Sequence, residues 1–292
     1  MNVLVFPGQG AQYPSMASDL PLDRLEVEQA FSTAQDILGY DLLAAMRDAD
    51  ADELKQTHIA QPALYVHSLI RLNAAESLPS IDAVAGHSLG EFTALACAQV
   101  YDFATGLKLV RDRSQAMKSA CDQVGGTMAA VLGLDDEIVE KVCEDIDGVV
   151  VAANYNSPGQ IVISGEMDAI ASASQVLSDK GARKVVPLVV GGAFHSPLME
   201  PARKQLAESI EAADFKAPTC PVYQNVHGKP VTDPAELKKN LIAQLTAPVR
   251  WSQSMQRMIA DGADHIYEVG GNGKVLRGLF KRIDRNLSSD VI

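Results

Sequence analysis

The sequence predicts an α/β fold with a smaller α/β unit inserted into it. Short apolar runs at residues 2–6 and 81–86 each lead into a glycine-containing turn, which is typical of buried strands. In residues 126–190, short segments with the periodicity of strands alternate with segments that have the periodicity of helices. A chain of 292 residues is long enough for a large domain that contains a small inserted one.

The first elements of the chain are predicted from apolar runs and glycines. NVLVF, residues 2–6, is expected to be a strand that stops at the proline and glycines of PGQGAQ. A second strand at residues 81–86 precedes a helix that begins near Leu89 or Gly90 and continues through EFTALACAQV. A longer helix is predicted at residues 102–121, where apolar side chains recur at helical spacing.

The inserted unit is predicted from six consecutive segments. Strands are expected at residues 126–134, 148–156, 160–165 and 182–190, and helices at residues 135–146 and 167–181. This order of strands and helices is that of the split βαβ, or ferredoxin-like, unit. We therefore expect a small domain at residues 126–195 and a large domain built from residues 1–125 and 196–292.

Composition and charge exclude several classes of protein. Apolar residues make up 47% of the chain and charged residues 21%, which is typical of globular proteins and excludes disordered and fibrous ones. The formal net charge of −12 argues against nucleic acid as a partner, because phosphates require a basic surface. No apolar run approaches the roughly 20 residues of a membrane span, so we expect no membrane partner.

The compartment is predicted from the N-terminus and the cysteines. MNVLVF lacks the basic lead of a signal peptide. The four cysteines form no CxxC pair and no regular spacing, which favours reduced thiols and gives no support to a metal site. We therefore expect a cytoplasmic protein.

One basic cluster stands out in this acidic chain. It lies near the C-terminus and contains Lys274, Arg277, Lys281, Arg282 and Arg285. The common interpretation of such a run is a solvated helix face. The alternative is a docking site for an acidic partner.

The stretch GHSLG, residues 86–90, predicts an exposed nucleophile. The two glycines allow a sharp turn between strand and helix, so that the hydroxyl of Ser88 stands at a helix N-terminus. Backbone N–H groups at that position can stabilise an oxyanion. An incidental glycine-rich turn is the alternative, but the strand and helix on either side favour the nucleophile.

A nucleophilic serine needs a base, and the chain offers six histidines. His87 is a poor candidate because consecutive side chains point away from one another. His195 follows the last strand of the inserted unit and two glycines, from where it could return to a cleft between the domains. His227 and His265 remain as alternatives, and any of the three could be a hydrogen-bonded structural histidine.

The helix at residues 102–121 offers two arginines for anion binding. Arg111 and Arg113 lie about 80° to either side of the apolar stripe at 3.6 residues per turn. Periodicity does not decide which of them points inward, and both could be surface arginines with buried stems.

Eight ordered motifs make the chain similar to the malonyl-CoA:acyl carrier protein transacylases and the related acyltransferase domains of polyketide synthases. They span nearly the whole chain, and such a series is more specific than any single motif. The motifs are FPGQGAQ (6–12), QPAL (61–64), GHSLGE (86–91), RSQAM (113–117), NSPGQIVISG (156–165), AFHSPLM (193–199), PVRW (248–251) and GGNGKVLRGLFKRI (270–283).

This resemblance implies a fold, a reaction and a set of site residues. The fold would be a hydrolase-like α/β core interrupted by the ferredoxin-like unit, and the reaction would move a malonyl group from malonyl-CoA to an acyl carrier protein through a seryl ester. The implied residues are Ser88 as nucleophile, His195 as base, Arg113 for the malonyl carboxylate, the backbone N–H groups of Gln12 and Leu89 for the oxyanion, and Gln244 near the carbonyl that supports the histidine.

The resemblance also bears on acyl specificity. Phe194 and Leu89 are the residues that accompany malonyl in this family, since a bulky side chain before the histidine crowds an α-methyl group. Two departures occur, Gly271-Asn272-Gly273 in place of Gly-Pro-Gly and Arg113-Ser114 in place of Arg-Gly. Neither changes a residue with an implied chemical role.

Two rival functions follow from the same residues. The first is a serine thioesterase or hydrolase, which would have the same turn around its nucleophilic serine. The second is a non-catalytic protein that only binds carrier proteins. The inward arginine argues against the first, and the intact set of Ser88, His195 and Arg113 argues against the second. We expect a monomer that needs no cofactor, and the sequence leaves open fatty acid or polyketide synthesis.

Overall fold

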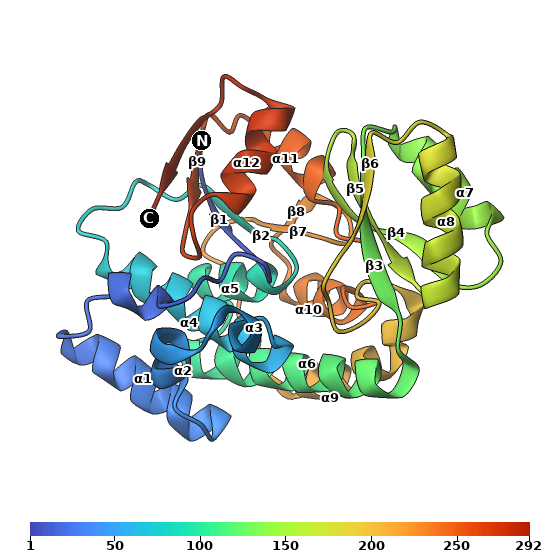
Figure 1. Cartoon of the computed structure of the whole chain (residues 1–292). Helices are drawn as coiled ribbons and strands as arrows, with labels where there is room; N and C mark the ends of the chain where they lie inside the picture. The colour runs from blue at the N-terminus through green and yellow to red at the C-terminus, as the bar shows by residue number, and fades with distance from the viewer.

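A computed structural model describes all 292 residues and contains two β-sheets. In the first sheet all neighbouring strands are parallel except the last pair. Its order is β10 (Ser288–Val291), β9 (His265–Glu268), β1 (Asn2–Phe6), β2 (Ala83–Gly86), β7 (Val222–Gln224) and β8 (Lys229–Val231). The second sheet lies beside it, at the right of Figure 1.

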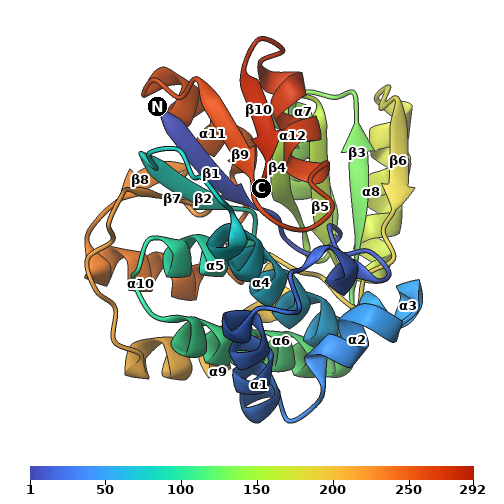
Figure 2. The same ribbon diagram turned by 90° about the vertical axis from the view of Figure 1, so that its left-hand side faces the viewer.

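Helices cover both faces of the first sheet, which explains why its central strands are continuous apolar runs. One face packs against α4 (Thr57–Ala74), α5 (Leu89–Cys97) and α6 (Phe103–Val124), and the other against α11 (Trp251–Ala260) and α12 (Val275–Ile283). Along β1, Leu4 and Phe6 belong to the first core, whereas Val3 and Val5 belong to the second. Figure 2 shows α4, α5 and α6 stacked beneath the strands.

The remaining helices of the large unit form an outer layer. α6 packs against α4, α9 and α1, so it is covered on several sides. The outer elements are α1 (Leu25–Leu38), α2 (Leu42–Asp48), α3 (Ala51–Leu54), α9 (Glu200–Ala212), α10 (Pro234–Ala243) and the short 3-10 turns Met16–Asp19 and Pro197–Met199. No helix is both long and apolar enough to span a membrane.

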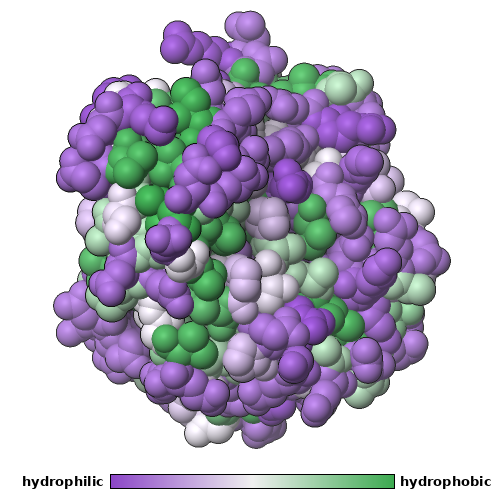
Figure 3. Space-filling view, turned by 90° about the vertical axis from the view of Figure 1, so that its right-hand side faces the viewer, coloured by the Kyte–Doolittle hydropathy of each residue, from purple (hydrophilic) through white to green (hydrophobic).

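The second sheet is antiparallel and is built from one continuous segment. Its order is β4 (Val150–Ser157), β5 (Gln160–Gly165), β3 (Thr127–Leu132) and β6 (Lys184–Pro187), with α7 (Asp136–Asp145) and α8 (Met167–Asp179) packed on one face. All six elements predicted here are present, and their ends differ from the prediction by a few residues at most. In Figure 3 the outer face of this small unit is largely hydrophilic, with interrupted hydrophobic patches.

The small unit is joined to the large unit by its other sheet face and by backbone hydrogen bonds. Val249 donates its N–H to the carbonyl of Ala153 at 2.8 Å, and Tyr155 donates to the carbonyl of Val249 at 2.9 Å. Arg282 adds a side-chain hydrogen bond to Gln160 at 2.6 Å. These contacts join the small unit to the large one.

Candidate active site

Ser88 occupies the sharp turn between β2 and α5. Its backbone has φ 53° and ψ −107°, a conformation that non-glycine residues rarely adopt. A Cβ atom on Gly86 would overlap the backbone of Gly90, and one on Gly90 would overlap the carbonyl of Phe6. The two glycines are therefore needed for the close approach of strand and helix, as the motif predicted.

His195 provides the only imidazole that reaches Ser88. Its Nε2 lies 2.8 Å from Ser88 Oγ, and its Nδ1 lies 2.9 Å from the backbone carbonyl of Gln244. A carbonyl only accepts hydrogen bonds, so Nδ1 carries the proton and Nε2 is left as an acceptor for the serine hydroxyl. Burial and the positive charge of Arg113 lower the pKa of His195 to about 3, which keeps the ring neutral.

The other candidate bases lie elsewhere. His87 lines the same cleft, but its Nε2 lies 2.8 Å from Asn156 Oδ1 and its ring packs against Trp251. His265 stacks on Tyr267 and bonds Asp290, and His227 is exposed. The alternatives to His195 therefore have structural or surface positions.

The structure places Arg113 inward and Arg111 at the surface. Arg113 is 1% exposed, and its Nη2 donates to Ser88 Oγ at 2.9 Å and to Gln244 Oε1 at 3.2 Å. Burial lowers the pKa of Arg113 to about 9, an effect that the charge of Glu91 opposes. Arg111 instead pairs with its neighbour Asp112 and donates to the carbonyl of Ile37.

Gln12 and Leu89 line the cleft together with Ser88, and the backbone N–H of each is free. Leu89 is the first residue of α5, so its N–H has no acceptor within the helix. Gln12 lies in the loop after β1, and its own N–H makes no hydrogen bond. The Gln12 side chain turns back and accepts the N–H of Gly10 at 2.7 Å, which shapes this loop.

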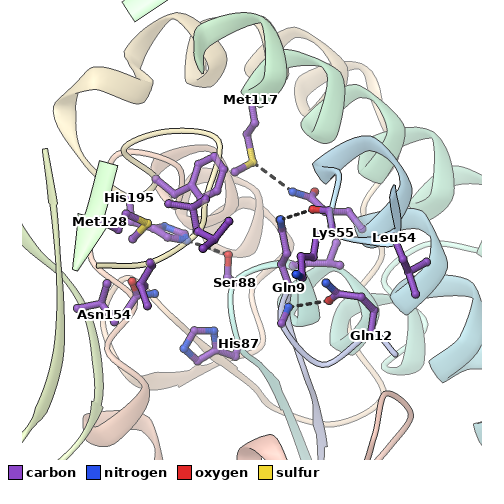
Figure 4. A pocket seen from close by; sticks show the side chains of 18 of the residues that line it. Gln9, Gln12, Leu54, Lys55, His87, Ser88, Met117, Met128, Asn154 and His195 are labelled. Atoms are coloured by element: carbon purple, nitrogen blue, oxygen red, sulfur yellow. Dashed lines mark hydrogen bonds between the residues drawn. The ribbon is translucent and has the colours of Figure 1, made fainter. Parts of the chain in front are cut away.

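These groups line a cleft of about 470 Å³ between the two units. Figure 4 shows Ser88 in the middle, with His195, Met128 and Asn154 on one side and Gln9, Gln12, Leu54 and Lys55 on the other. The segment that returns from the small unit contributes Leu188, Val189, Val190 and Phe194. All the residues expected for the site are thus in one place, with Gln244 directly behind Arg113 and His195.

Two buried polar atoms near the cleft have no partner. Arg113 Nε and Gln61 Oε1 both lack a hydrogen bond, although both residues line the cleft. The Nε2 of Gln61 makes only a 3.4 Å contact with the sulfur of Met117. A buried guanidinium with a free donor is suited to an anionic ligand such as a carboxylate.

Sequence reasoning missed a second layer of residues behind Ser88. Glu91, Gln224 and Asn225 are all fully buried, and both Gln224 and Asn225 donate a hydrogen bond to the Glu91 carboxylate. Glu91 could have been noticed as the one charged residue of the apolar helix LGEFTALAC. Asn225 carries a weaker signal, a polar residue at the end of a buried strand.

The C-terminal basic cluster lies outside the cleft. α12 and the residues on either side of it carry Lys274, Lys281, Arg282 and Arg285 with exposed side chains. Arg277 is partly covered and bonds Ser289. Both interpretations of the cluster, a solvated face and a docking site, are compatible with this position.

Known proteins resemble this chain along nearly its whole length. The model of the acyl transferase domain family matches residues 3–284. The chain is 42% identical over 292 residues to the malonyl CoA-acyl carrier protein transacylase of Escherichia coli strain K12, a match that covers 99% of this chain and 94% of that protein.

Solved structures agree with these relatives. An acyl carrier protein S-malonyltransferase from Vibrio cholerae has a TM-score of 0.94 at 41% identity, covering 100% of this chain and 96% of that one. A malonyl-transacylase in complex with its type II polyketide synthase acyl-carrier protein has a TM-score of 0.94 at 37% identity, covering 100% and 95%.

Proposed function

The chain belongs to the acyl transferase family and moves malonyl groups from malonyl-CoA to an acyl carrier protein, and from this premise we propose which residues carry the reaction. The transfer serves fatty acid or polyketide synthesis. We assign the chemistry to Ser88 and His195, substrate binding to Arg113, and oxyanion binding to the N–H groups of Gln12 and Leu89.

The first half-reaction acylates Ser88. Nε2 of His195, 2.8 Å from the hydroxyl, takes its proton as Ser88 Oγ attacks the thioester carbonyl of malonyl-CoA. The N–H groups of Gln12 and Leu89 bind the oxyanion of the tetrahedral intermediate. The bond from carbon to sulfur then breaks, and His195 returns the proton to the departing CoA thiolate.

The second half-reaction reverses these steps with a new thiol. The pantetheine thiol of the carrier protein gives its proton to His195 as its sulfur attacks the malonyl ester. The ester bond to Ser88 breaks, and Oγ recovers the proton from His195. Both substrates use the same serine in turn, so ping-pong kinetics follow.

Arg113 has a different partner in each state. In the free protein its Nη2 donates to Ser88 Oγ, while Nε has no partner. A malonyl group on Ser88 carries its carboxylate into this region, where the planar guanidinium can bind it with two parallel hydrogen bonds. The same grip positions the ester for a thiol and limits access by water.

We assign acyl specificity to two side chains that line the cleft near Ser88. Phe194 lines the cleft next to His195, and Leu89 follows Ser88. An α-methyl group on the acyl chain would meet these side chains, and one such misfit costs roughly 1 to 3 kcal/mol. We therefore propose a preference for malonyl over methylmalonyl.

We also propose a finer description of the fold. The six-stranded sheet would be a hydrolase-like core made of residues 1–125 and 196–292, and residues 126–195 would be a ferredoxin-like insertion. The antiparallel order β4-β5-β3-β6 supports the insertion, and the nucleophile between a parallel strand and a helix supports the core. We further propose that the protein acts as a monomer and needs no cofactor beyond the CoA thioester.

The convergence of Ser88, His195 and Arg113 carries this proposal, and partitioning of the acyl group tests it. The malonyl-protein should pass its acyl group to an added holo carrier protein much faster than it releases free malonate. The rival thioesterase activity predicts the opposite ratio. Release of malonate at an equal or higher rate would overturn the transfer mechanism.

A further inference from the structure

The backbone of Ser88 is held in an unfavourable conformation by side chains from distant parts of the chain. Its positive φ of 53° is the kind of strain that persists only where the surroundings enforce it. The Ser88 N–H donates to Asn225 Oδ1 at 2.7 Å, and its carbonyl accepts from Gln244 Nε2 at 3.0 Å. Both backbone polar groups of the nucleophile are thus bound by amide side chains.

Asn225 connects the two sides of the turn. Besides accepting from Ser88, its Nδ2 donates to the carbonyl of Gly86 at 2.7 Å. Asn225 follows β7, which pairs with β2 only as far as Ala85 and Tyr223. The side-chain amide therefore continues the pairing of β2 and β7 past the point where the backbone ladder ends.

Asn225 is itself held by its backbone. Its N–H donates to Glu91 Oε2 at 2.7 Å, and its carbonyl accepts the N–H of Arg250 at 2.9 Å. Glu91 also accepts from Gln224 Nε2 at 3.1 Å. Since Glu91 lies in the first turn of α5, this set of contacts ties the helix after the serine to the strand beside it.

We propose that Asn225 is a positioning residue for the transfer, which sets the backbone of Ser88 and so aligns both its Oγ and the N–H of Leu89. Asn225 is fully buried and does not line the cleft, so it acts through Ser88 and not on the substrate. Loss of its amide removes the two hydrogen bonds that Asn225 makes to the turn, one with the Ser88 N–H and one with the Gly86 carbonyl. A displacement of about 1 Å at a reacting group is enough to cost roughly a hundredfold in rate.

The inference rests on the proposed role of Ser88, so the experiment first locates the malonyl adduct by peptide mapping of the unmodified protein. An adduct away from Ser88 would refute the proposed function itself. With the adduct on Ser88, the acylation rate constant and KM for malonyl-CoA are measured for Asn225→Ala. We expect the rate constant to fall about tenfold to a hundredfold, with KM changed less than about threefold.

Asn240 provides the matched control. It is a buried asparagine of the same network, but its Nδ2 bonds only Gln224 Oε1 at 2.9 Å. Asn240→Ala should lower the unfolding temperature about as much as Asn225→Ala while leaving the acylation rate within about threefold of the unmodified protein. Equal rate losses in the two variants would overturn the proposal, because a purely structural role predicts them.

An isosteric variant separates positioning from stability. Asn225→Asp keeps an acceptor for the Ser88 N–H, although a carboxyl group buried beside Glu91 should destabilise the fold more than alanine does. We expect Asn225→Asp to acylate faster than Asn225→Ala despite a lower unfolding temperature. An acylation rate no higher than that of Asn225→Ala would overturn the proposal. If the alanine variant does not fold, Asn225→Ser and Asn240→Ser replace the two alanine variants, because a hydroxyl can hydrogen-bond one of the groups that the amide leaves. The rate loss is then expected only in Asn225→Ser.

Discussion

Arg113 is a buried cation that forms no ion pair and has one donor, Nε, without a hydrogen-bond partner. It lies in the core with a positive charge, and the nearest carboxylate that affects its pKa, Glu91, is not in an ion pair with it. Its contacts are Ser88 Oγ, Gln244 Oε1 and the face of the Phe92 ring, with the ring centroid 5.4 Å away. A substrate carboxylate would supply the missing anion.

Replacing this arginine should separate malonyl from acetyl transfer. In Arg113→Ala the malonyl carboxylate has no partner in a buried site, and truncation of one side of such a pair costs roughly 2 to 5 kcal/mol. Malonyl transfer should therefore fall about thirtyfold to several thousandfold. Acetyl-CoA has no carboxylate, so its transfer should survive or improve. Steady-state kinetics with both CoA esters measure the difference.

Arg111 is the control for this prediction, because it lies on the same helix and its side chain faces the surface. Arg111→Ala should leave both substrates nearly unaffected. The assignment would be refuted by equal malonyl and acetyl losses in Arg113→Ala, or by the larger loss in Arg111→Ala.

The depressed pKa of His195 predicts an unusual pH profile. The base accepts a proton only when neutral, so the rate falls below its pKa, which burial and Arg113 lower to about 3. The acylation rate should therefore stay level from about pH 8 down to about pH 5, whereas an ordinary histidine gives a fall below about 6.5. Rapid-quench measurements of the seryl ester across this range provide the test.

Glu91 also titrates within this pH range, because burial raises its pKa to about 7. Its titration could therefore change the acylation rate independently of His195. Repeating the series with Glu91→Gln removes that titration. An acid limb near pH 6.5 that persists in Glu91→Gln would show that His195 has an ordinary pKa.

At the scale of elements, the turn between β2 and α5 depends on two glycines. Gly90→Ala places a Cβ against the carbonyl of Phe6 in β1, and such overpacking costs roughly 1 to 3 kcal/mol. We expect lower stability in urea unfolding together with slower acylation, because α5 must move away from β1. Unchanged values of both would contradict the close approach.

Gly278 is the matched control for that substitution. It lies within α12, and a Cβ there meets no atom within 4 Å. Gly278→Ala should raise the unfolding free energy by roughly 0.5 to 1 kcal/mol, since alanine is the better helix former. Glycine to alanine is thus expected to lower the unfolding free energy at Gly90 and to raise it at Gly278.

Local features of the sequence predicted the elements well, whereas the site depended on contacts between distant residues. β1, β5 and the Ser88 turn follow from short apolar runs and glycines, and their bounds agree with the prediction. Periodicity did not choose between Arg111 and Arg113, because α6 packs on several sides and has no single inner face. Asn225 contacts Ser88 across 137 positions of sequence, and no local pattern carries that information.

At the scale of the whole molecule, the cleft is formed by two units held together through backbone hydrogen bonds at Val249. The protein carries a formal charge of −12, and it transfers the acyl group to an acyl carrier protein. An acidic carrier protein would need a local basic surface for docking, and the cluster on α12 is our candidate.

Reversing charge on that surface tests docking separately from chemistry. The double variant Arg277→Glu and Lys281→Glu should raise KM for an acidic carrier protein and leave the malonyl-CoA half-reaction unchanged, because neither residue lines the cleft that holds Ser88. Lys204→Glu with Lys239→Glu makes the same charge change on α9 and α10, which lie below the six-stranded sheet in Figure 1, whereas α12 lies above it. Equal effects of the two double variants, or an unaltered KM, would place docking elsewhere.

The central claim is that Ser88 carries the malonyl group between the two thiols, and the intact mass of the protein tests it most directly. After mixing with malonyl-CoA, the unmodified protein should gain one malonyl group, and holo carrier protein should remove it. Ser88→Ala should remain folded and gain no mass, since the hydroxyl lines the cleft and contributes little to packing. A malonyl adduct on Ser88→Ala, or an adduct that the carrier protein does not remove, would contradict the account.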